Sequence, residues 1–318
     1  MNYRSFSDLN STILQGIARI PRNVDLVVGI PRSGMLPANL LALYLNKPYT
    51  DLESFVNGHI YNTGERGRLM DMNLIKKVLV VDDSVFAGEA MERAKQKLAK
   101  STVNSELVFC AVYVSPGSER HLDIWFEEVA PPRVFQWNVL HHSVLERACV
   151  DIDGVLCVDP TEEQNDDGIG YVEFLRKATP LFLPSRRIRT IVTSRLEKYR
   201  DETEFWLREH GITYDSLVML DLPSKEARQA SGCHATHKAR EYLKKEYSLF
   251  IESDPMQSLK INEITKKPVL CTATFEMVYH NKKLIDPIRR RKLGRFKRWC
   301  LSKLNPRFVK AVRSARSG

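Results

Sequence analysis

The stretch VLVVDDSVFAGEA, residues 78–90, contains the pattern that decides the fold. Four apolar residues predict a buried strand, two adjacent carboxylates follow at its end, and Gly88 lies in a short loop that opens a helix. Adjacent acids beside a small-residue turn suit a sugar phosphate. The carboxylates can accept hydrogen bonds from vicinal hydroxyls, while free backbone N–H groups of the turn hold a phosphate. The stretch therefore predicts a βα unit with an anion-binding turn.

Strand and helix patterns alternate on both sides of this unit. The predicted strands are 25–30, 76–83, 105–114, 147–154, 187–194, 215–220 and 247–254, and the predicted helices are 35–47, 87–100, 201–211 and 237–247. Such alternation is typical of α/β folds built on mainly parallel sheets. A chain of 318 residues is long enough for two domains of about 150 residues each. We predict domains at 1–145 and 146–281, with the seam after VFQWNVLHH.

The composition is that of an ordinary globular protein. Hydrophobic residues make up 43% and charged residues 27%, which excludes a disordered chain, a collagen-like repeat and a coiled coil. No apolar stretch approaches the roughly 20 residues that cross a bilayer, and the N-terminus lacks the pattern of a signal peptide. We expect a cytoplasmic protein.

The six cysteines indicate reduced thiols. They form no C-x-x-C pair, and Cys110 and Cys149 lie in apolar strand-like runs. Cys233, His234 and His237 approach the spacing of metal ligands, but no second ligand pair follows at a suitable distance. We therefore expect no zinc site.

The charge is concentrated at the C-terminus. From residue 282 to the end there are 14 Lys and Arg and one acid, Asp286, whereas the rest of the chain has 34 basic and 38 acidic residues. Apolar residues recur at steps of three to five between the basic runs, which predicts an amphipathic helix over part of 282–318. Such a tail can lie on anionic lipid, bind nucleic acid or simply keep the C-terminus solvated. Trp299, Phe296 and the leucines favour lipid, because phosphate contacts alone need no apolar face.

The motif at 78–90 resembles the phosphoribosyl pyrophosphate (PRPP) motif of type I phosphoribosyltransferases. Upstream, VVGIPRSGMLPA at 27–38 resembles the pyrophosphate loop of that family, and FVNGHIYNTGERGRL at 55–69 resembles its mobile loop. The resemblance implies a parallel sheet and a PRPP site, with Arg66 and Arg68 able to close over the pyrophosphate. The residues implied in PRPP binding are Arg32, Ser33, Gly34, Asp82, Asp83, Ser84, Val85, Phe86, Ala87 and Gly88.

The loop departs from the family pattern in its second half. Family members usually carry Thr or Ser there to bind the 5-phosphate, whereas this chain has Phe86, Ala87 and Ala90. Phosphate binding must then depend on backbone amides and Ser84. Purine-salvage members have an Asp at the position of Phe86, so its absence argues against a purine acceptor. By position alone, Glu53 and Glu89 are candidates for the base that deprotonates the acceptor.

A second pair of carboxylates lies in CVDIDGVL, residues 149–156. Asp151 and Asp153 stand two residues apart at the end of a buried strand, so we expect both to project to the same side. One acid can then attack phosphorus while the other protonates the leaving group, with Mg²⁺ between them.

This stretch resembles motif I of the haloacid dehalogenase (HAD) superfamily of phosphatases. The resemblance implies Asp151 as nucleophile and Asp153 as acid and base, Thr193 on the phosphoryl group, and Lys238, at the opening of a helix, as the partner of the nucleophile. Lys225 is the competing lysine. The implied magnesium ligands are Asp151, Ile152 through its carbonyl, Asp153, Glu252 and Asp254. About 30 residues separate the first two motifs, which predicts a HAD-like Rossmannoid domain with little or no cap and an open site.

Together the two halves predict a bifunctional enzyme. The first would transfer 5-phosphoribosyl from PRPP to an acceptor hydroxyl, and the second would remove the 5-phosphate. The arrangement resembles the ribofuranosyltransferase and phosphatase pairs of bacterial capsule and O-antigen synthesis. That resemblance implies a lipid-linked glycan acceptor, and the basic tail then places the enzyme on the inner face of the membrane. Two alternatives stay open: a nucleobase phosphoribosyltransferase coupled to a nucleotide phosphatase, and a PRPP-sensing regulator whose tail binds nucleic acid.

Overall fold

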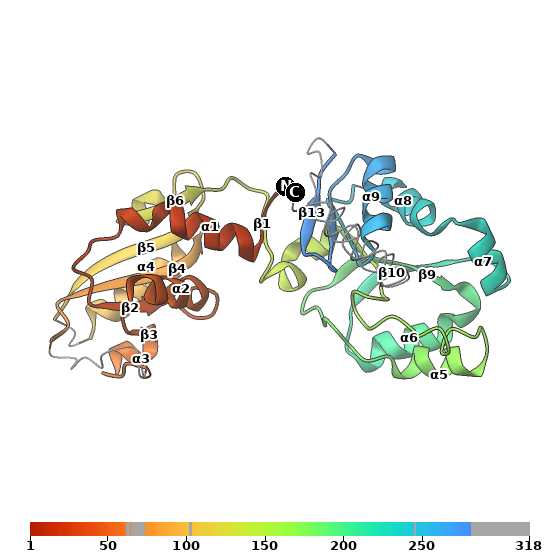
Figure 1. Ribbon diagram of the computed structural model, residues 1–318, viewed down its shortest axis with the longest axis horizontal. Helices are drawn as coiled ribbons and strands as arrows, with labels where there is room; N and C mark the ends of the chain where they lie inside the picture. Colours follow the sequence, from red (N-terminus) through yellow and green to blue (C-terminus); the bar gives the residue numbers. More distant parts are fainter. Residues whose placement is uncertain (62–63, 65–73, 102–103, 245, 281–318) are drawn as a thin grey trace, which may run out of the picture. The chain divides into compact units, whose positions relative to one another are not determined.

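The computed structural model describes residues 1–61, 64, 74–101, 104–244 and 246–280. Contacts divide the chain into two units, Met1–Val139 and Leu140–Gly318 (Figure 1). The predicted seam at residue 145 falls in the short 3-10 segment Ser143–Arg147, which precedes the first strand of the second unit. Because each unit has its own sheet and its own buried core, each is described by itself below.

The first unit contains a five-stranded parallel sheet in the order β3-β2-β4-β5-β6. A separate two-stranded parallel sheet joins β1 to β7, with Asn2 opposite Arg133. The elements are β1 (Asn2–Arg4), α1 (Phe6–Gly16), β2 (Leu26–Gly29), α2 (Met35–Leu45), β3 (Tyr49–Asp51), α3 (Leu52–Val56), β4 (Lys77–Val85), α4 (Glu89–Ala99), β5 (Glu106–Val114), β6 (Ile124–Glu128) and β7 (Arg133–Phe135).

Both faces of the five-stranded sheet are covered by helices. Val27 and Leu79 pack into a core cluster with residues of α1 and α2, whereas their neighbours Val28 and Val80 pack into a second cluster with residues of α3 and α4. Successive side chains of a strand point to opposite faces, so a strand buried on both faces needs an unbroken apolar run. This requirement explains the runs from which the strands were predicted.

Strand β4 is longer than the sequence pattern predicted. It continues to Val85, where it still pairs with Val114 of β5, so Asp82 and Asp83 lie within the paired strand rather than beyond its end. The prediction ended the strand at the carboxylates because acids are rare in buried strands. The long partner strand β5 supplies the backbone hydrogen bonds that extend β4 past them.

The second unit contains a six-stranded sheet in the order β10-β9-β8-β11-β12-β13, in which only the β12 and β13 pair is antiparallel. Its elements are β8 (Ala148–Val150), α5 (Ile169–Lys177), β9 (Ile188–Leu196), α6 (Arg200–Glu209), β10 (Tyr214–Leu220), α7 (Lys225–Ser231), α8 (His234–Lys244), β11 (Leu249–Glu252), α9 (Pro255–Thr265), β12 (Val269–Cys271) and β13 (Glu276–Val278). The only α-helix between β8 and β9 in the described chain is α5.

Within the described ranges no helix combines the length and apolar character needed to span a membrane. Five cysteines, at positions 110, 149, 157, 233 and 271, form no disulfide among the described residues, and four of them are buried. The basic tail and the arginines at 66 and 68 lie outside the residues that the structure describes, so the predictions made for them stay predictions.

Candidate active sites

The acid pair of β4 is buried and bonded to the loop that follows β2. Asp82 and Asp83 are 6% and 3% exposed. Asp83 accepts hydrogen bonds from Ser33 Oγ at 2.9 Å and from Trp137 Nε1 at 2.6 Å, and Asp82 accepts one from the Asp83 backbone N–H at 2.9 Å. The structure therefore brings together the two motifs that resemble the pyrophosphate loop and the PRPP motif. Trp137, which joins them from beyond β7, has no motif of its own and was not predicted.

Burial is the main influence on the pKa of Asp82 in this pair. Burial raises the pKa of Asp82 well above its usual range, and the negative charge of Asp83 raises it further, while the positive charge of Arg133 acts in the opposite direction. The Arg133 guanidinium is itself buried, and it lies 5.4 Å from the ring centroids of Phe86 and Phe135. Arg133 is thus the nearby cation that balances two buried acids, although nothing in the sequence around it indicates this role.

Gly34 allows the close approach of the two motifs. A Cβ on this residue would lie 2.4 Å from the Ile30 carbonyl oxygen, 2.8 Å from that of Val81 and 2.9 Å from Asp82 Oδ1. These atoms are backbone or buried carboxylate, so they cannot move aside as the tip of a flexible side chain can. The glycine is required here for space, since its backbone angles are ordinary.

We expect Gly34→Ala to lower PRPP-dependent activity by at least about 100-fold, because the loop must move away from the acid pair. Pyrophosphate release measures the effect. Gly168→Ala is the matched control, since the nearest atom to its added Cβ is at 3.4 Å, an ordinary contact. Equal activity of the two variants would show that the close packing at Gly34 is not needed.

We expect Asp82→Asn to stabilise the unliganded protein at about pH 8 while it impairs PRPP binding. The folded protein holds the Asp82 proton more tightly than the unfolded chain, so stability falls as pH rises from near the ordinary pKa, about 4, through the raised one. The variant removes this loss, and its melting temperature should exceed that of the wild type more at high pH than at low pH. A lower melting temperature at high pH would contradict the assignment.

The loop after β4 is supported by the segment that follows β5. Ser115 N–H donates to the Val85 carbonyl at 2.9 Å, and the Ser118 hydroxyl donates to the Phe86 carbonyl. Gly88, with φ of 89°, begins α4, and a Cβ there would lie 2.4 Å from the His121 ring. Val85 thus ends β4, directly after Ser84, and Phe86, Ala87 and Gly88 form the connection to the N-terminus of α4. The binding of an anion by this turn stays a prediction.

The two predicted base candidates have other partners. Glu53 pairs with Lys97, and Glu89 lies 3.9 Å from Arg93; both carboxylates are exposed. Neither lines the cavity of about 720 Å³ beside the pyrophosphate-loop residues. That cavity is lined by Phe6, Leu9, Asn10, Arg32, Ser33, Met35, Leu36, Asn39, Leu40, Trp137 and Asn138. The space next to Arg32 and Ser33 is therefore largely apolar and aromatic.

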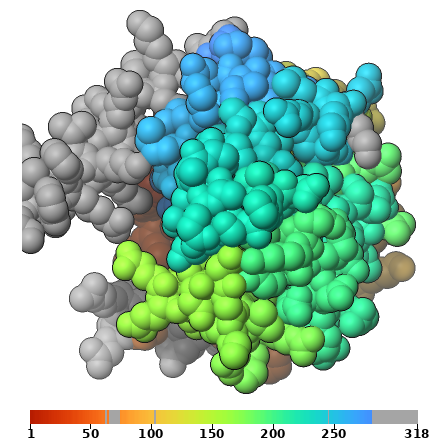
Figure 2. All heavy atoms as spheres, turned by 90° about the vertical axis from the view of Figure 1, so that its right-hand side faces the viewer, coloured from red at the N-terminus to blue at the C-terminus, as the bar shows by residue number. Residues whose placement is uncertain are grey.

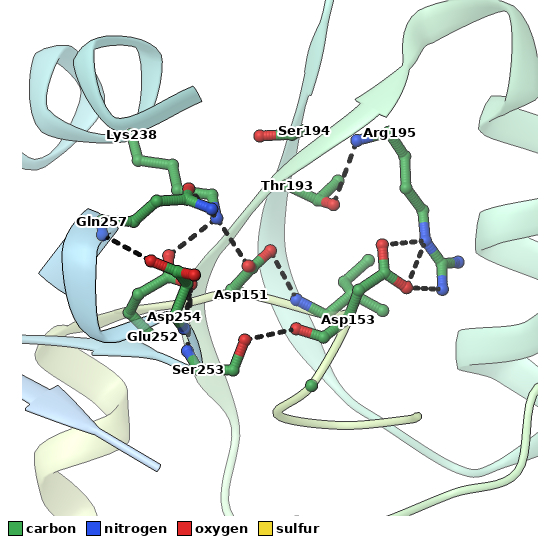
Figure 3. Close-up of polar contacts among 12 residues, drawn as sticks. Asp151, Asp153, Thr193, Ser194, Arg195, Lys238, Glu252, Ser253, Asp254 and Gln257 are labelled. Carbon is green, nitrogen blue, oxygen red and sulfur yellow. Dashed lines mark hydrogen bonds and ion pairs between the residues drawn. The ribbon is translucent and has the colours of Figure 1, made fainter. Parts of the chain in front are cut away.

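In the second unit, Asp151 lies in a cavity of about 730 Å³ and is paired with Lys238 (Figure 3). Lys238 Nζ is 2.6 Å from Asp151 Oδ2 and 2.7 Å from Glu252 Oε2, and it donates to Gln257 Oε1 at 3.0 Å. The predicted helix start was wrong: α8 begins at His234, which places Lys238 in its second turn. The competing lysine, Lys225, instead donates to the Asn165 carbonyl.

Burial dominates the electrostatics of Asp151. Desolvation is the largest influence and raises the pKa of Asp151, the charge of Lys238 opposes it, and the neighbouring acids Glu252 and Asp153 add to it, which together raise the pKa to about 7. Burial opposes the charged form of Lys238 as well, but the two carboxylates outweigh this and raise its pKa above the usual range. The site therefore holds one cation between two carboxylates.

Asp153 has a different partner from Asp151. Strand β8 ends at Val150, so both acids follow the strand and its alternation does not set their directions, which was the basis of the prediction. The Asp153 carboxylate pairs with Arg195 through Nε at 3.1 Å and Nη2 at 2.6 Å (Figure 3). Arg195 is fully buried and was missed, because a single arginine at the end of β9 has no distinctive sequence signal.

Thr193 does not stand at the end of its strand as predicted. Strand β9 continues to Leu196, and the buried Thr193 Oγ1 accepts a hydrogen bond from the Arg195 backbone N–H at 3.2 Å. The next residue, Ser194, lines the cavity, whereas Thr193 is not among its lining residues. On β9, the residue that lines the cavity is thus one position further along the chain than the resemblance implied.

The carboxylates of this cavity suit a hard cation such as Mg²⁺, but one predicted ligand does not. The Ile152 carbonyl accepts backbone hydrogen bonds from Val155, Leu156 and Cys157, so it faces into the turn. The Asp153 carbonyl oxygen is better placed as a metal ligand. It accepts a hydrogen bond from Ser253 Oγ at 3.1 Å and so lies beside the acids of 252–254. No three His, Cys, Asp or Glu side chains in the described ranges are already arranged around one point.

The two acids at the end of β11 also have structural partners. Glu252 Oε1 accepts the backbone N–H groups of Ser253 and Asp254 at 3.0 Å each. Asp254 Oδ1 accepts those of Met256 and Gln257, which caps α9. A cation held by Asp151, the Asp153 carbonyl and Asp254 would therefore use the carboxylate oxygens that remain.

Comparisons with known proteins bear on the first unit. Residues 3–143 match the family model described as a phosphoribosyl transferase domain. A xanthine-guanine-hypoxanthine phosphoribosyltransferase of Helicobacter pylori is 16% identical, with 43% of this chain and 92% of that one covered and a TM-score of 0.34. A purine phosphoribosyltransferase of Pyrococcus horikoshii is 21% identical, with 43% and 92% covered and a TM-score of 0.32. An orotate phosphoribosyltransferase of Aeropyrum pernix is 18% identical, with 39% and 71% covered and a TM-score of 0.28.

No curated protein matches the chain. The family match spans the parallel sheet of the first unit and both of its predicted motifs, including the loop of Arg32 and the acid pair of β4. Residues 3–143 of this chain therefore match a phosphoribosyl transferase domain.

Proposed function

We propose that the chain is a bifunctional enzyme that transfers 5-phosphoribosyl from PRPP to a glycan hydroxyl and then removes the 5-phosphate. One observation carries the proposal. The chain that contains a phosphoribosyl transferase domain also has a second cavity, in which Asp151 pairs with Lys238 after a parallel strand. A phosphoribosyltransferase leaves a phosphate on its product, and a phosphatase can remove it. The net result is a ribofuranosyl group, with pyrophosphate and phosphate released.

In the first site, the bond from C1 to the pyrophosphate oxygen breaks and a bond from the acceptor oxygen to C1 forms. Asp82 and Asp83 hold the ribose hydroxyls, and Arg32 stabilises the leaving pyrophosphate. The acceptor enters through the cavity that Phe6 and Trp137 line beside Arg32. Its proton passes to a general base; the predicted candidates Glu53 and Glu89 lie outside the lining of this cavity and pair with Lys97 and Arg93, so their role stays a prediction.

In the second site, which resembles HAD phosphatases, Asp151 attacks phosphorus and the ester oxygen leaves with a proton from Asp153. Water then releases phosphate, with Asp153 taking the proton back. Arg195 holds the Asp153 carboxylate at 3.1 Å and 2.6 Å, so the proposal requires this carboxyl to leave Arg195 as substrate enters. Mg²⁺ held by Asp151, the Asp153 carbonyl and Asp254 would screen the repulsion between carboxylate and phosphate.

We further propose that residues 282–318 hold the enzyme on the anionic inner face of the membrane, where a lipid-linked glycan is available. This rests on the net charge of +13 in that stretch and on the apolar residues between its basic runs. Nucleic acid is not the expected partner, because phosphate contacts need no apolar face.

A second candidate acceptor is a nucleobase. The cavity beside Arg32 is lined mainly by apolar and aromatic side chains, among them Phe6, Leu36 and Trp137, which suit a flat, weakly polar ring better than a hydroxyl-rich sugar. In that case the phosphatase site would act on the resulting nucleotide. The absence of a carboxylate at Phe86 argues against a purine.

The deciding experiment incubates the full-length protein with PRPP, Mg²⁺ and a membrane glycolipid extract, followed by mass spectrometry. We expect one pentose to be added to the glycolipid, with pyrophosphate and phosphate released in equal amounts. Parallel incubations contain single nucleobases in place of the extract. Consumption of a base with no change in the glycolipid would replace the first candidate by the second.

A further inference from the structure

Arg228 lies on the wall of the second cavity and is buried without a carboxylate partner. It is 9% exposed, and it lines the same cavity as Asp151 and Lys238. Nη1 donates to the Ser194 carbonyl and Nη2 to Asn165 Oδ1, both at a long 3.3 Å. Its Nε has no hydrogen-bond partner among the residues that the structure describes. Within the described residues the guanidinium thus hydrogen-bonds neutral groups and no carboxylate.

The other two buried cations of this cavity region are neutralised. Arg195 pairs with Asp153, and Lys238 pairs with Asp151 and Glu252. No ion pair involves Arg228 in the described part of the chain. An unpaired buried cation is costly, and a buried polar group without a partner calls for an explanation such as a bound ligand.

The position of Arg228 depends on the packing of α7. Figure 2 looks onto this helix, in turquoise at the centre, above the yellow-green segment that contains α5. The Lys225 backbone N–H donates to Asp167 Oδ2 at 3.2 Å, which ties the start of α7 to that segment. Arg228, one turn later, then points inward beside Asn165 and Ser194, and the buried Ser194 Oγ has no hydrogen-bond partner among the residues with a described position. The guanidinium is therefore held in place by elements on both sides.

Charges are unevenly distributed around the cavity. Its acidic residues are Asp151, Asp153, Asp159, Glu252 and Asp254, whereas Asn165, Tyr171, Ser194, Arg228 and His234 supply neutral and basic groups. Burial lowers the pKa of His234, and the positive charge of Arg228 lowers it further, so His234 adds a neutral hydrogen-bonding group. Arg228 is then the one cation lining the described cavity that no carboxylate neutralises.

We propose that Arg228 is a substrate-binding residue of this cavity that contacts an oxyanion of the phosphorylated substrate. The proposal rests on the phosphatase function proposed above. Guanidinium groups bind phosphate and carboxylate oxygens through paired N–H donors, and a buried one does so without competition from water. The oxyanion is either the phosphoryl group itself or a second anionic group of the same substrate.

The test compares wild type with Arg228→Met, Arg228→Lys and the exposed control Arg240→Met. The substrates are p-nitrophenyl phosphate, glycerol 3-phosphate and 3-phosphoglycerate, and inorganic phosphate is the inhibitor. We expect Arg228→Met to raise KM by about tenfold or more with kcat changed by less than about threefold, and Arg228→Lys to lie between. If Arg228 contacts the phosphoryl group, KM rises for every ester and the phosphate Ki rises with it. If it contacts a second anionic group, only the carboxylated ester, 3-phosphoglycerate, shows a raised KM.

KM and Ki values of Arg228→Met equal to those of Arg240→Met would overturn the proposal. If Arg228→Met fails to fold, the melting temperatures of wild type and Arg228→Lys are compared with and without phosphate or 3-phosphoglycerate. We expect these anions to raise the melting temperature less in Arg228→Lys than in wild type. An equal rise in both proteins would refute the role of Arg228 in anion binding. The wild-type protein could also hydrolyse none of the esters while these anions raise its melting temperature more than that of Arg228→Lys. This outcome would refute the phosphatase function and leave the anion site at Arg228 supported.

Discussion

With Asp151→Asn, a pentose phosphate accumulates on the acceptor in place of a pentose, because the nucleophile of the second site is lost while the first site is intact. We expect phosphate release to fall by at least about a thousandfold and pyrophosphate release to stay within about twofold of wild type. The amide keeps the size of the carboxyl group, and its oxygen can still accept a hydrogen bond from Lys238, which Glu252 continues to neutralise. The bond from the Ile152 backbone N–H to the other oxygen is lost, but the fold should hold. Mass spectrometry of the product and separate assays of phosphate and pyrophosphate measure the outcome.

Asp201→Asn is the control for this variant, since Asp201 is an exposed acid of α6 in the same unit. It should leave both releases unchanged. Loss of pyrophosphate release in Asp151→Asn would mean that the two chemistries do not belong to separate sites. Unchanged phosphate release would remove Asp151 from the role of nucleophile.

Asp83→Asn should have the opposite effect, abolishing transfer while hydrolysis of a supplied phosphate ester continues. Asp83 accepts hydrogen bonds from Ser33 and Trp137 through its two oxygens, and the amide nitrogen of Asn cannot accept either. The variant therefore loses a negative charge, and the bond to Ser33 can persist only with its direction reversed, the amide N–H donating to the hydroxyl. We expect pyrophosphate release to fall by at least about 100-fold, and the rise in melting temperature caused by PRPP with Mg²⁺ to disappear.

The matched control is Glu128→Gln, an exposed acid at the end of β6 in the same unit. It should bind PRPP as wild type does. If Asp83→Asn retained PRPP-dependent stabilisation, the acid pair would not be the ribose site. If it lost hydrolysis of p-nitrophenyl phosphate as well, the two units would not act independently.

Much of the fold could be predicted from the sequence, because its signals are local. Strands buried on both faces need unbroken apolar runs, and helices that cover them need apolar residues at three- to four-residue spacing. The parallel sheet of residues 3–143 and the position of its two loops were predicted correctly for this reason. Element ends were less accurate: β4 and β9 continue beyond their predicted ends, because pairing with a neighbouring strand extends them.

The residues of the candidate sites could likewise be predicted only where their signal is local in the sequence. Asp82, Asp83, Asp151 and Asp153 could be selected from the sequence because acids that follow an apolar run stand out against it. Their partners could not, since Trp137 and Arg195 carry no local pattern and reach the acids only through folding. The Ile152 carbonyl was misassigned because a sequence does not show which backbone oxygens a turn consumes.

The sequence by itself therefore determined the α/β class, the strand-end carboxylates and the charge of the tail, all of which depend on residues close together in the chain. Only the tertiary structure decided which cations face those carboxylates. Lys238 rather than Lys225 meets Asp151, Arg133 lies beside the buried acid pair, and Arg228 is left without a carboxylate. The physical reason is that a buried charge is stabilised by whatever group the fold places within a few ångströms, irrespective of its distance along the sequence.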